Sequence, residues 1–274
     1  MKKSFLTIAL AVLALAGAST QASAQTAPAD VQAVDLGLPS GLKWASCNVG
    51  ATTPEGYGNY YAWGETAPKA DYSWATYKYA NGDINKLTKY CYDASYGNNG
   101  FTDSKTTLES EDDATTANWG KEWRMPTDAE WTELQENCTW TWATQSGVKG
   151  YQVSSKTNGN SIFLPAAGYR DGTVLNGAGS YGNYWSSSLL TVRPYGAWYV
   201  YFYLDNVSRG SSRRYYGQSV RPVQVSGIGT GIGDTAADVV ATDAHKIIRN
   251  GQVLIERGGK VYTITGQELT TPSK

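Results

Sequence analysis

The sequence predicts an α+β fold that is irregular and β-rich, with few short helices and long ordered loops, followed by a small C-terminal β meander. Three observations support this prediction. Apolar and polar residues alternate over short stretches that end at glycine, asparagine or proline, which is typical of short strands and turns. Only one segment carries a strong helix-start signal. Glycine is abundant, with 30 residues in 274, and 20 Tyr and 10 Trp stand against 4 Phe, a usage suited to half-exposed surfaces.

Residues 1–24 have the pattern of a signal peptide. Lys2 and Lys3 precede an apolar run from Phe5 to Ala16, and Ala22-Ser23-Ala24 offers the small residues that signal peptidase recognises. We expect a mature N-terminus at Gln25 and a secreted, periplasmic or cell-surface location. The run is shorter than the roughly 20 residues of a membrane span, so no integral membrane segment is expected after cleavage.

After a flexible lead over 25–33, the main domain is expected to begin with a hairpin. Two strands, 34–38 and 42–49, flank Pro39-Ser40-Gly41, which has the residue types of a turn. Residues 60–63 (Tyr-Tyr-Ala-Trp) are a second strand candidate. Residues 65–107 are rich in Gly, Asn, Asp and Tyr and are expected to form long surface loops.

The best-supported helix begins at Thr127. Thr127 and Glu130 have the spacing of a capping box, in which each side chain accepts a hydrogen bond from the other residue's backbone amide. Trp131, Leu134 and Cys138 follow on one helix face. We therefore interpret Glu130 as a cap and Trp131 as a core residue.

Strands are expected after this helix. A hairpin over 151–155 and 161–166 turns at Asn158-Gly159-Asn160. In 198–204, alternation puts Trp198, Val200, Phe202 and Leu204 on one face of a strand and Tyr199, Tyr201 and Tyr203 on the other. The remaining expected strands are 139–144, 185–188 and 219–225.

The main domain is expected to span residues 34–225, because the composition changes beyond them. Residues 226–245 form a Gly-rich linker. Residues 246–274 form a short C-terminal β segment, whose apolar runs are separated by Asn250-Gly251 and Gly258-Gly259. Such a segment is too small to be stable alone, and it is expected to dock, to be recognised by a partner or to serve in sorting.

Composition excludes several kinds of chemistry. The formal net charge is −1, which gives no electrostatic reason to expect nucleic acid as a partner. The single histidine, His245, lies in the tail, so histidine-dependent triads and zinc sites are not expected. Cys47, Cys91 and Cys138 allow any one of three disulfides or three buried thiols. No cofactor is indicated; calcium held by oxygen ligands stays open, although no loop motif indicates it.

Six strings occur in order: VDLGLPSGLKWASCNVG at 34–50, YYAWGE at 60–65, WRMPTDAEW at 123–131, GNSIFLPAAGYR at 159–170, YWSSS at 184–188 and SVRPV at 219–223. Together they resemble the Fibrobacter succinogenes major paralogous domain, common in exported proteins of Bacteroidetes and similar in turn to formylglycine-generating enzymes. The resemblance implies a C-type-lectin-like fold over residues 34–225 and structural roles for Arg124, Trp131 and Arg221. The paired cysteines that hold copper in those enzymes have no counterpart in 206–218, so their activity is not implied.

The C-terminal segment has a weaker resemblance of its own. Its Gly259-Lys260-Val261-Tyr262 and Gly266-Gln267-Glu268 resemble the ends of exported Bacteroidetes proteins. Some of those ends act as signals for type IX secretion, although this segment is shorter than a full sorting domain.

These observations favour an exported, non-catalytic binding module that recognises an extracellular glycan or protein. We expect the ligand site on loops 169–184, 191–197 and 205–217, because Tyr, Ser, Gly, Asn and Arg are favoured in recognition loops. The candidate ligand-binding residues are Tyr169, Arg170, Asp171, Tyr181, Tyr184, Tyr195, Arg213, Arg214, Tyr215 and Tyr216.

Two alternatives remain. A carboxylate-based enzyme, such as a glycoside hydrolase, would need two acids, with Glu55, Glu65, Asp71, Glu109, Asp112 and Asp113 as candidates. The chain could instead be a structural subunit of a cell-surface assembly that pairs by strand addition.

Overall fold

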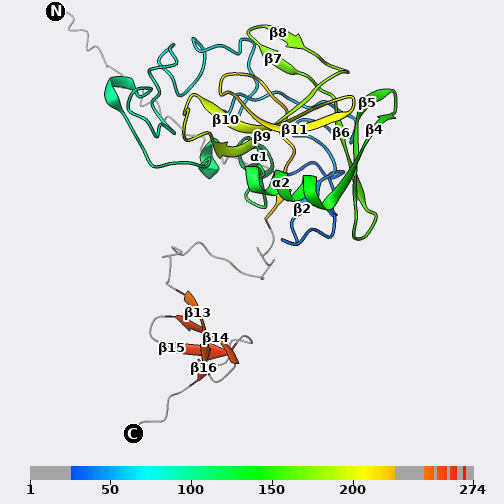
Figure 1. Ribbon diagram of the computed structural model, residues 1–274, viewed down its shortest axis with the longest axis vertical. Coiled ribbons are helices and arrows are strands. Elements are labelled where there is room, and N and C mark those ends of the chain that lie inside the picture. The colour runs from blue at the N-terminus through cyan, green and yellow to red at the C-terminus, as the bar shows by residue number, and fades with distance from the viewer. Residues whose placement is uncertain (1–25, 226–243, 250–251, 258–259, 264–267, 270–274) are drawn as a thin grey trace, which may run out of the picture. The chain divides into compact units, whose positions relative to one another are not determined.

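The computed structural model of the chain (Figure 1) describes residues 26–225, 244–249, 252–257, 260–263 and 268–269. It is β-rich, with few short helices and several small antiparallel sheets. The chain divides into two compact units, Met1–Ile228 and Gly229–Lys274. The expected signal peptide and nearly all of the Gly-rich linker lie outside the described residues. Within the described residues, no helix is long and apolar enough to cross a membrane.

The first sheet joins segments that are far apart in sequence. The expected N-terminal hairpin is present, but its strands are shorter than predicted because Leu36, Leu38 and Leu42 leave the ladder to enter the core. The predicted closing strand over 219–225 is likewise reduced to its last part, which lies between two other strands. The sheet order is β1 (Ala33–Asp35), β2 (Lys43–Ala45), β12 (Val223–Gln224) and β3 (Trp123–Arg124).

The predicted helix is confirmed as α2 (Asp128–Asn137). Both bonds of the capping box between Thr127 and Glu130 are present, and Trp131 and Leu134 are fully buried. Arg124 also donates to Glu130 from both guanidinium Nη atoms, over 2.7 and 2.5 Å. The sequence prediction missed three further short helices: α1 (Ala114–Trp119) and the 3-10 turns η1 (Asn98–Gly100) and η2 (Ser110–Asp112).

The chain after α2 forms the second sheet. β4 (Cys138–Gln145) starts directly at the helix end and pairs with β5 (Val148–Ser155), which pairs with β6 (Ser161–Pro165). The predicted hairpin at residues 158–160 is therefore confirmed. The β4–β5 turn at residues 146–147 was not predicted.

The third sheet lies at the centre of Figure 1, with α2 on one side of it and the β7–β8 hairpin on the other. Its order is β11 (Asn206–Arg213), β10 (Gly196–Tyr203), β9 (Gly182–Leu189). Two predicted loops are thus partly wrong. Most of 205–217 is strand β11, and 169–184 contains β7 (Tyr169–Asp171), β8 (Val174–Asn176) and the start of β9.

Aromatic residues build much of the core. The segment 60–63 is buried but is not a strand; Tyr61 makes an isolated bridge to Gln218. The prediction that 65–107 forms surface loops is wrong in part. Although it has almost no regular structure, its Tyr72, Tyr77 and Tyr90 are buried, because their hydroxyls find partners inside the domain.

The second unit has the strands expected in the C-terminal segment and one more. Its sheet is antiparallel, in the order β13 (Ala244–Arg249), β14 (Gln252–Arg257), β15 (Lys260–Thr263) and β16 (Glu268–Leu269). The turns expected at 250–251 and 258–259 lie outside the described residues.

Candidate binding face

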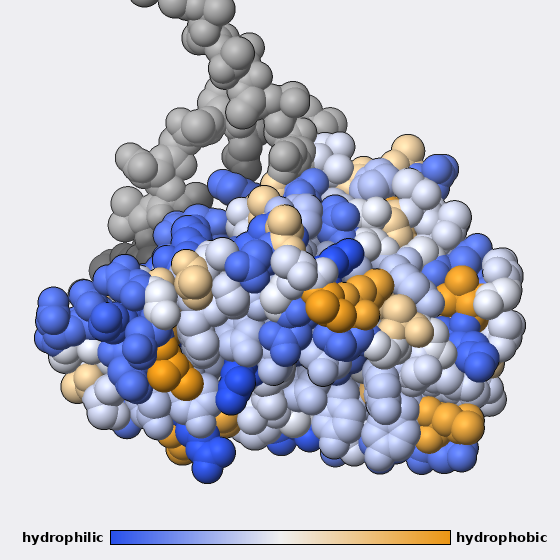
Figure 2. All heavy atoms as spheres, turned by 90° about the horizontal axis from the view of Figure 1, so that it is seen from above, coloured by the Kyte–Doolittle hydropathy of each residue, from blue (hydrophilic) through white to orange (hydrophobic). Residues whose placement is uncertain are grey.

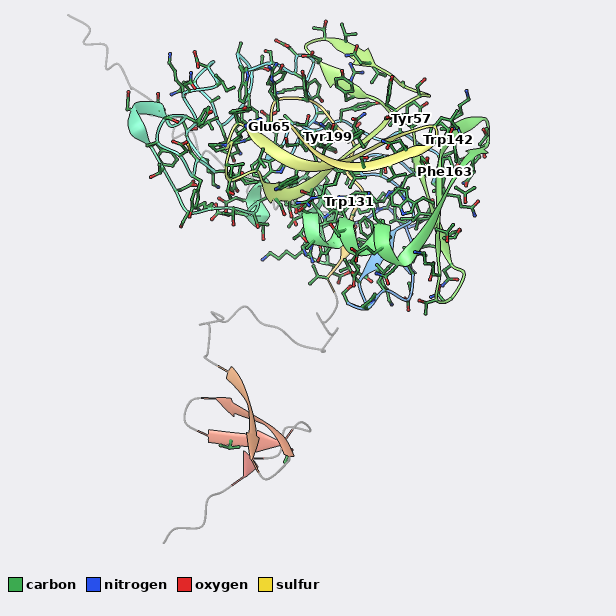
Figure 3. The ribbon with its side chains drawn as sticks, in the orientation of Figure 1. Tyr57, Glu65, Trp131, Trp142, Phe163 and Tyr199 are labelled. Atoms are coloured by element: carbon green, nitrogen blue, oxygen red, sulfur yellow. The ribbon has the colours of Figure 1, made fainter. Side chains whose placement is uncertain are left out.

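The two sides of β10 have different surroundings. Val200 and Phe202 point into the core, where the Phe202 ring lies 5.7 Å from that of Tyr184, and Tyr184 contacts Trp131 of α2. Tyr199, Tyr201 and Tyr203 alternate with them and point to the opposite side. In Figure 3, Tyr199 and Trp131 accordingly lie on opposite sides of the sheet.

Neighbouring strands bring small polar residues to the side that carries these tyrosines. Asn183 of β9 pairs with Tyr201, while Gly210 and Ser208 of β11 pair with Tyr199 and Tyr201. Paired residues point to the same side of a sheet. We call this side the tyrosine face; it consists of Asn183, Tyr199, Tyr201, Tyr203, Asn206, Ser208 and Gly210, together with the buried Trp185 opposite Tyr199.

The tyrosine rings overlap above β11. The rings of Tyr199 and Tyr201 are nearly parallel, at 22°, with centroids 5.3 Å apart. Both reach over Gly210, where an added Cβ would lie 3.0 Å from Tyr199 Cε1 and 3.2 Å from Tyr201 Cε1. The lack of a side chain at Gly210 therefore lets both rings settle on the neighbouring strand. At the far end of the row, Tyr203 and Tyr181 are 42% and 47% exposed, with ring centroids 6.0 Å apart.

A pocket of about 290 Å³ adjoins the row at Tyr199. Polar groups form much of its wall. Gln218 donates from Nε2 to Ser212 Oγ over 2.7 Å, while Gln218 Oε1 and Asn183 Nδ2 are buried without a hydrogen-bond partner among the described residues. Its lining is Tyr169, Asn183, Tyr199, Ser211, Ser212, Arg213, Tyr216 and Gln218.

One positive and one negative side chain, Arg213 and Asp171, lie near the tyrosines of the pocket. Arg213 is exposed and donates to Tyr215 Oη over 3.4 Å. Burial raises the pKa of Tyr216; Tyr215 and Asp171 raise it further, and Arg213 acts against them. Burial also raises the pKa of Tyr199, to about 12. The pocket thus holds neutral phenols between one cation and one nearby carboxylate.

The structure brings together only some of the predicted ligand-binding residues. Tyr169, Arg213 and Tyr216 line the pocket, and Asp171 lies close enough to influence Tyr216. Tyr181 joins the far end of the row. Arg170 lies over the ring of Tyr60, and the ring of Tyr195 is 5.2 Å from that of Tyr96; neither lines the pocket.

Three predicted ligand residues need correction because they are buried. Tyr184 and Arg214 are 0% exposed and Tyr215 is 7% exposed. Tyr184 donates to Pro165 O over 2.8 Å inside the core. Arg214 donates to the Tyr77 hydroxyl and to backbone carbonyls of Lys89, Tyr90 and Pro194. These side chains hold the frame and do not offer a surface to a ligand.

Sequence reasoning missed the residues at the middle of the face. It recognised the alternation of Tyr199, Tyr201 and Tyr203 but treated the strand as a support for loops. The alternation itself could have indicated the face, because three large amphipathic rings on one side of a strand form a binding surface without any loop. No sequence motif marks Asn183 or Gln218 as a pocket residue, because they are distant in the sequence and only the fold brings them together.

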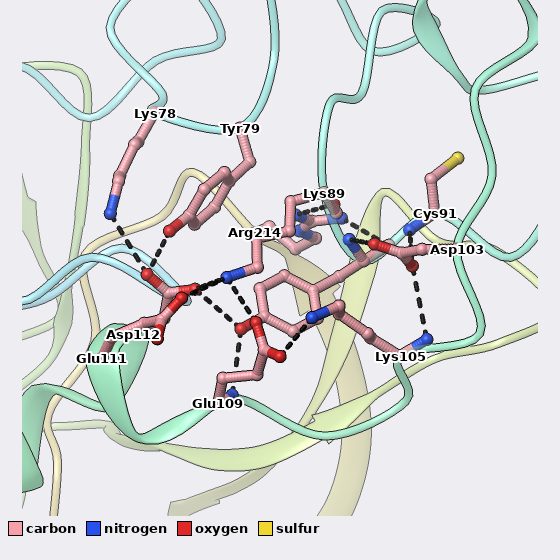
Figure 4. A network of polar contacts seen from close by, with 11 residues as sticks. Lys78, Tyr79, Lys89, Cys91, Asp103, Lys105, Glu109, Glu111, Asp112 and Arg214 are labelled. Atoms are coloured by element: carbon pink, nitrogen blue, oxygen red, sulfur yellow. Dashed lines mark hydrogen bonds and ion pairs between the residues drawn. The ribbon is translucent and has the colours of Figure 1, made fainter.

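The predicted catalytic carboxylates are engaged in other contacts. Figure 4 shows Asp112 at the centre of a network that includes Lys78, Lys89 and Tyr79. Tyr90 Oη also donates to Asp112, over 2.7 Å. Burial acts to raise the pKa of Asp112, but hydrogen bonds from Lys89, Tyr79, Tyr90 and Lys78 outweigh it and bring the pKa to about 2. Glu109, Glu111 and Asp112 are close enough together to suit a metal ion. The Lys89 ammonium, however, contacts all three carboxylates and supplies the positive charge there.

The remaining candidate acids also have structural partners. Asp113 caps α1 through the amides of Thr115 and Thr116 and also accepts from Met125 N; burial raises its pKa to about 6. Glu65 accepts from Lys69 and from Lys78 N. Asp71 accepts from Ser73 Oγ over 3.1 Å, and Glu55 accepts from Gln145 over 3.3 Å.

Comparison with known proteins adds nothing to this geometry: no family model, no curated protein and no solved structure matches the chain. The candidate site therefore depends on the contacts described above.

Proposed function

We propose that the chain is an exported, non-catalytic binding module that recognises an extracellular glycan through the tyrosine face and its pocket. The observation that carries this proposal is the row of Tyr199, Tyr201 and Tyr203 on the outer side of β10. Tyrosine offers a flat apolar ring with a polar hydroxyl, which suits the apolar faces and hydroxyls of sugars. We propose a secreted, periplasmic or cell-surface location from the signal-peptide pattern at residues 1–24.

We further propose that the domain has a C-type-lectin-like fold and belongs with the Fibrobacter succinogenes major paralogous domain. In support, residues of the resembling strings meet in the frame. Arg124 pairs with the capping residue Glu130, and Trp131 packs its ring 4.7 Å from that of Trp44. Arg221 is buried and bonds to Asn48, within the first of those strings. Residues from several of the resembling segments thus contact one another and stabilise the same frame.

A glycan suits this face better than a protein partner does. Protein interfaces are usually centred on well-packed apolar and aromatic anchors. Beside its tyrosines and the buried Trp185, the tyrosine face carries Asn183, Asn206, Ser208 and Gly210, which offer amides, a hydroxyl and open backbone. Figure 2, which views the molecule from the β7–β8 side, shows a mostly hydrophilic surface whose apolar residues form small separate groups. Carboxylate catalysis gains no support, because each candidate acid has a structural partner.

A glycan array tests the proposal. Wild-type protein is expected to bind a defined set of glycans, and the Tyr201→Ala, Tyr203→Ala double variant to lose at least about fivefold in affinity for them, as removal of binding hot spots does. Tyr92→Ala is the matched control, because Tyr92 is exposed but lies outside the face. Thermal unfolding of all three proteins checks that they are folded. No binding by the folded wild type, or equal binding by the double variant, would refute the proposal.

A further inference from the structure

We infer that the ligand of the tyrosine face is an extended, unbranched and uncharged saccharide chain that lies along β10 with one end in the pocket. This inference rests on the proposed function and specifies the ligand of the same site. Three independent features support it: the length of the aromatic row, the small residues of β11 beside the row, and the balance of charge at the pocket.

The row is long and continuous with the pocket. Tyr199 belongs to both, since it lines the pocket and pairs with Gly210 at the start of the row. From Tyr199 to Tyr203 a strand advances about 13 Å, and Tyr181 widens the far end. The pocket alone, at about 290 Å³, is at the small end for a ligand site. A compact ligand would fill only this pocket, whereas an extended chain would also contact the tyrosine rings.

The residues of β11 that lie beside the tyrosine row have small side chains or none. Gly210 and Ser208 stand opposite Tyr199 and Tyr201, so β11 places no large side chain beside the rings; on the β9 side the buried Trp185 stands opposite Tyr199. The rings of Tyr199 and Tyr201 stack on each other and, with Tyr203, follow one another along β10. A linear chain can contact successive rings of this row, whereas a branch point would hold the chain away from it.

The recognition groups favour a neutral ligand. Arg213 is the only charged residue among those that line the pocket, and Asp171 lies two residues after the lining residue Tyr169 on β7, on the same side of that strand. The other polar lining residues include Asn183, Gln218, Ser211 and Ser212, whose amides and hydroxyls both donate and accept. Sugar hydroxyls have the same dual character, so uncharged sugars match this wall.

Calorimetric titration with a size series of neutral linear oligosaccharides, chosen from the glycans that the wild-type protein binds, tests the inference. Affinity is expected to rise on the order of tenfold from disaccharide to hexasaccharide as further rings come into contact. It should change by less than about twofold between low and high salt, because no net charge is paired. A branched isomer and a uronic-acid analogue of the same length should bind more weakly than the neutral linear chain.

A glycine variant tests the geometry. In Gly210→Val the added side chain displaces the rings of Tyr199 and Tyr201, so the gain in affinity from disaccharide to hexasaccharide should disappear. Circular dichroism and thermal unfolding verify that the variant is folded. If the variant does not fold, the titrations of the wild-type protein with oligosaccharides of increasing length test the inference without it. Equal affinity for disaccharide and hexasaccharide, preference for the branched isomer, or a required charge would overturn the inference while leaving glycan binding intact. Absence of any glycan binding would instead overturn the proposed function, and the inference with it.

Discussion

Arg221 donates from Nε to Asn48 Oδ1 over 2.9 Å, and this bond joins the segment before β12 to the segment after β2. Its Nη atoms donate to Ala45 O and Phe163 O over 3.0 and 2.8 Å. Arg221 is completely buried and has no carboxylate partner among the described residues. Three oxygen dipoles from two stretches, residues 45–48 and β6, therefore stabilise its charge, and these bonds join both stretches to the segment of Arg221.

Arg221→Lys is expected to destabilise the domain by about 3 kcal/mol or more, because one ammonium cannot satisfy three separated acceptors and leaves buried carbonyls unpaired. The measurement is denaturant unfolding followed by tryptophan fluorescence. Arg193→Lys, at an exposed position, is the control and should match the wild type within about 0.5 kcal/mol. A loss no larger than that of the control would show that the Arg221 contacts do not hold the frame.

The Asp112 network gives the domain a defined response to acid. Because its pKa in the folded protein, about 2, is below the usual value of 3.8, its stabilising contribution is present above about pH 4 and is lost as the pH falls towards 2. Asp112→Asn should cost about 3 kcal/mol at pH 7, since it leaves the Lys89 ammonium without its buried partner. The difference from the wild type should shrink as the pH approaches 2.

Unfolding curves of both proteins at several pH values check this response. Asp30→Asn, a change at an exposed aspartate, should leave the curve unchanged at every pH. A difference between wild type and Asp112→Asn that stays constant down to pH 2 would contradict the expected acid response.

The cysteines are expected to behave as three buried thiols. Cys47, Cys91 and Cys138 are free and buried in the structure, and Cys47 and Cys91 donate to backbone oxygens. Burial raises the pKa of all three, that of Cys138 to about 11, so the reactive thiolate is scarce at neutral pH. A thiol reagent should modify none of them in the native protein and all three after unfolding. Two unreactive cysteines in denaturant without reductant would reveal a disulfide.

The features predicted well from the sequence are those set by neighbours along the chain. The capping box of Thr127 and Glu130 needs only its spacing, and the turn at Asn158-Gly159-Asn160 needs only its residue types. The alternation in 198–204 gave the correct faces for Tyr199 to Tyr203, since a strand has a period of two, whereas Leu204 lies beyond the end of β10 and is exposed. These local rules do not depend on where the rest of the chain lies.

Other parts of the fold depend on contacts between distant segments. Residues 65–107 were expected at the surface because they are polar, yet Tyr77 is buried; its hydroxyl donates to Trp63 O and accepts from Arg214, 137 positions away. Strand β11 was expected as a loop because Tyr, Ser, Gly, Asn and Arg are favoured in recognition loops. Its pairing with β10 overrides that preference. Burial of Arg214 and Tyr184 could not be predicted, because arginine and tyrosine are common on exposed surfaces.

An NMR footprint would show directly whether a glycan binds on the outer side of β10, as we propose. Backbone amide shifts of isotope-labelled protein would be followed while the best-bound linear glycan is added. The largest changes are predicted at Tyr199, Tyr201, Ser208 and Gly210 and at the pocket residues Ser212 and Gln218. Changes centred on residues 81–97, or none in β10 and β11 at saturating glycan, would contradict the claim.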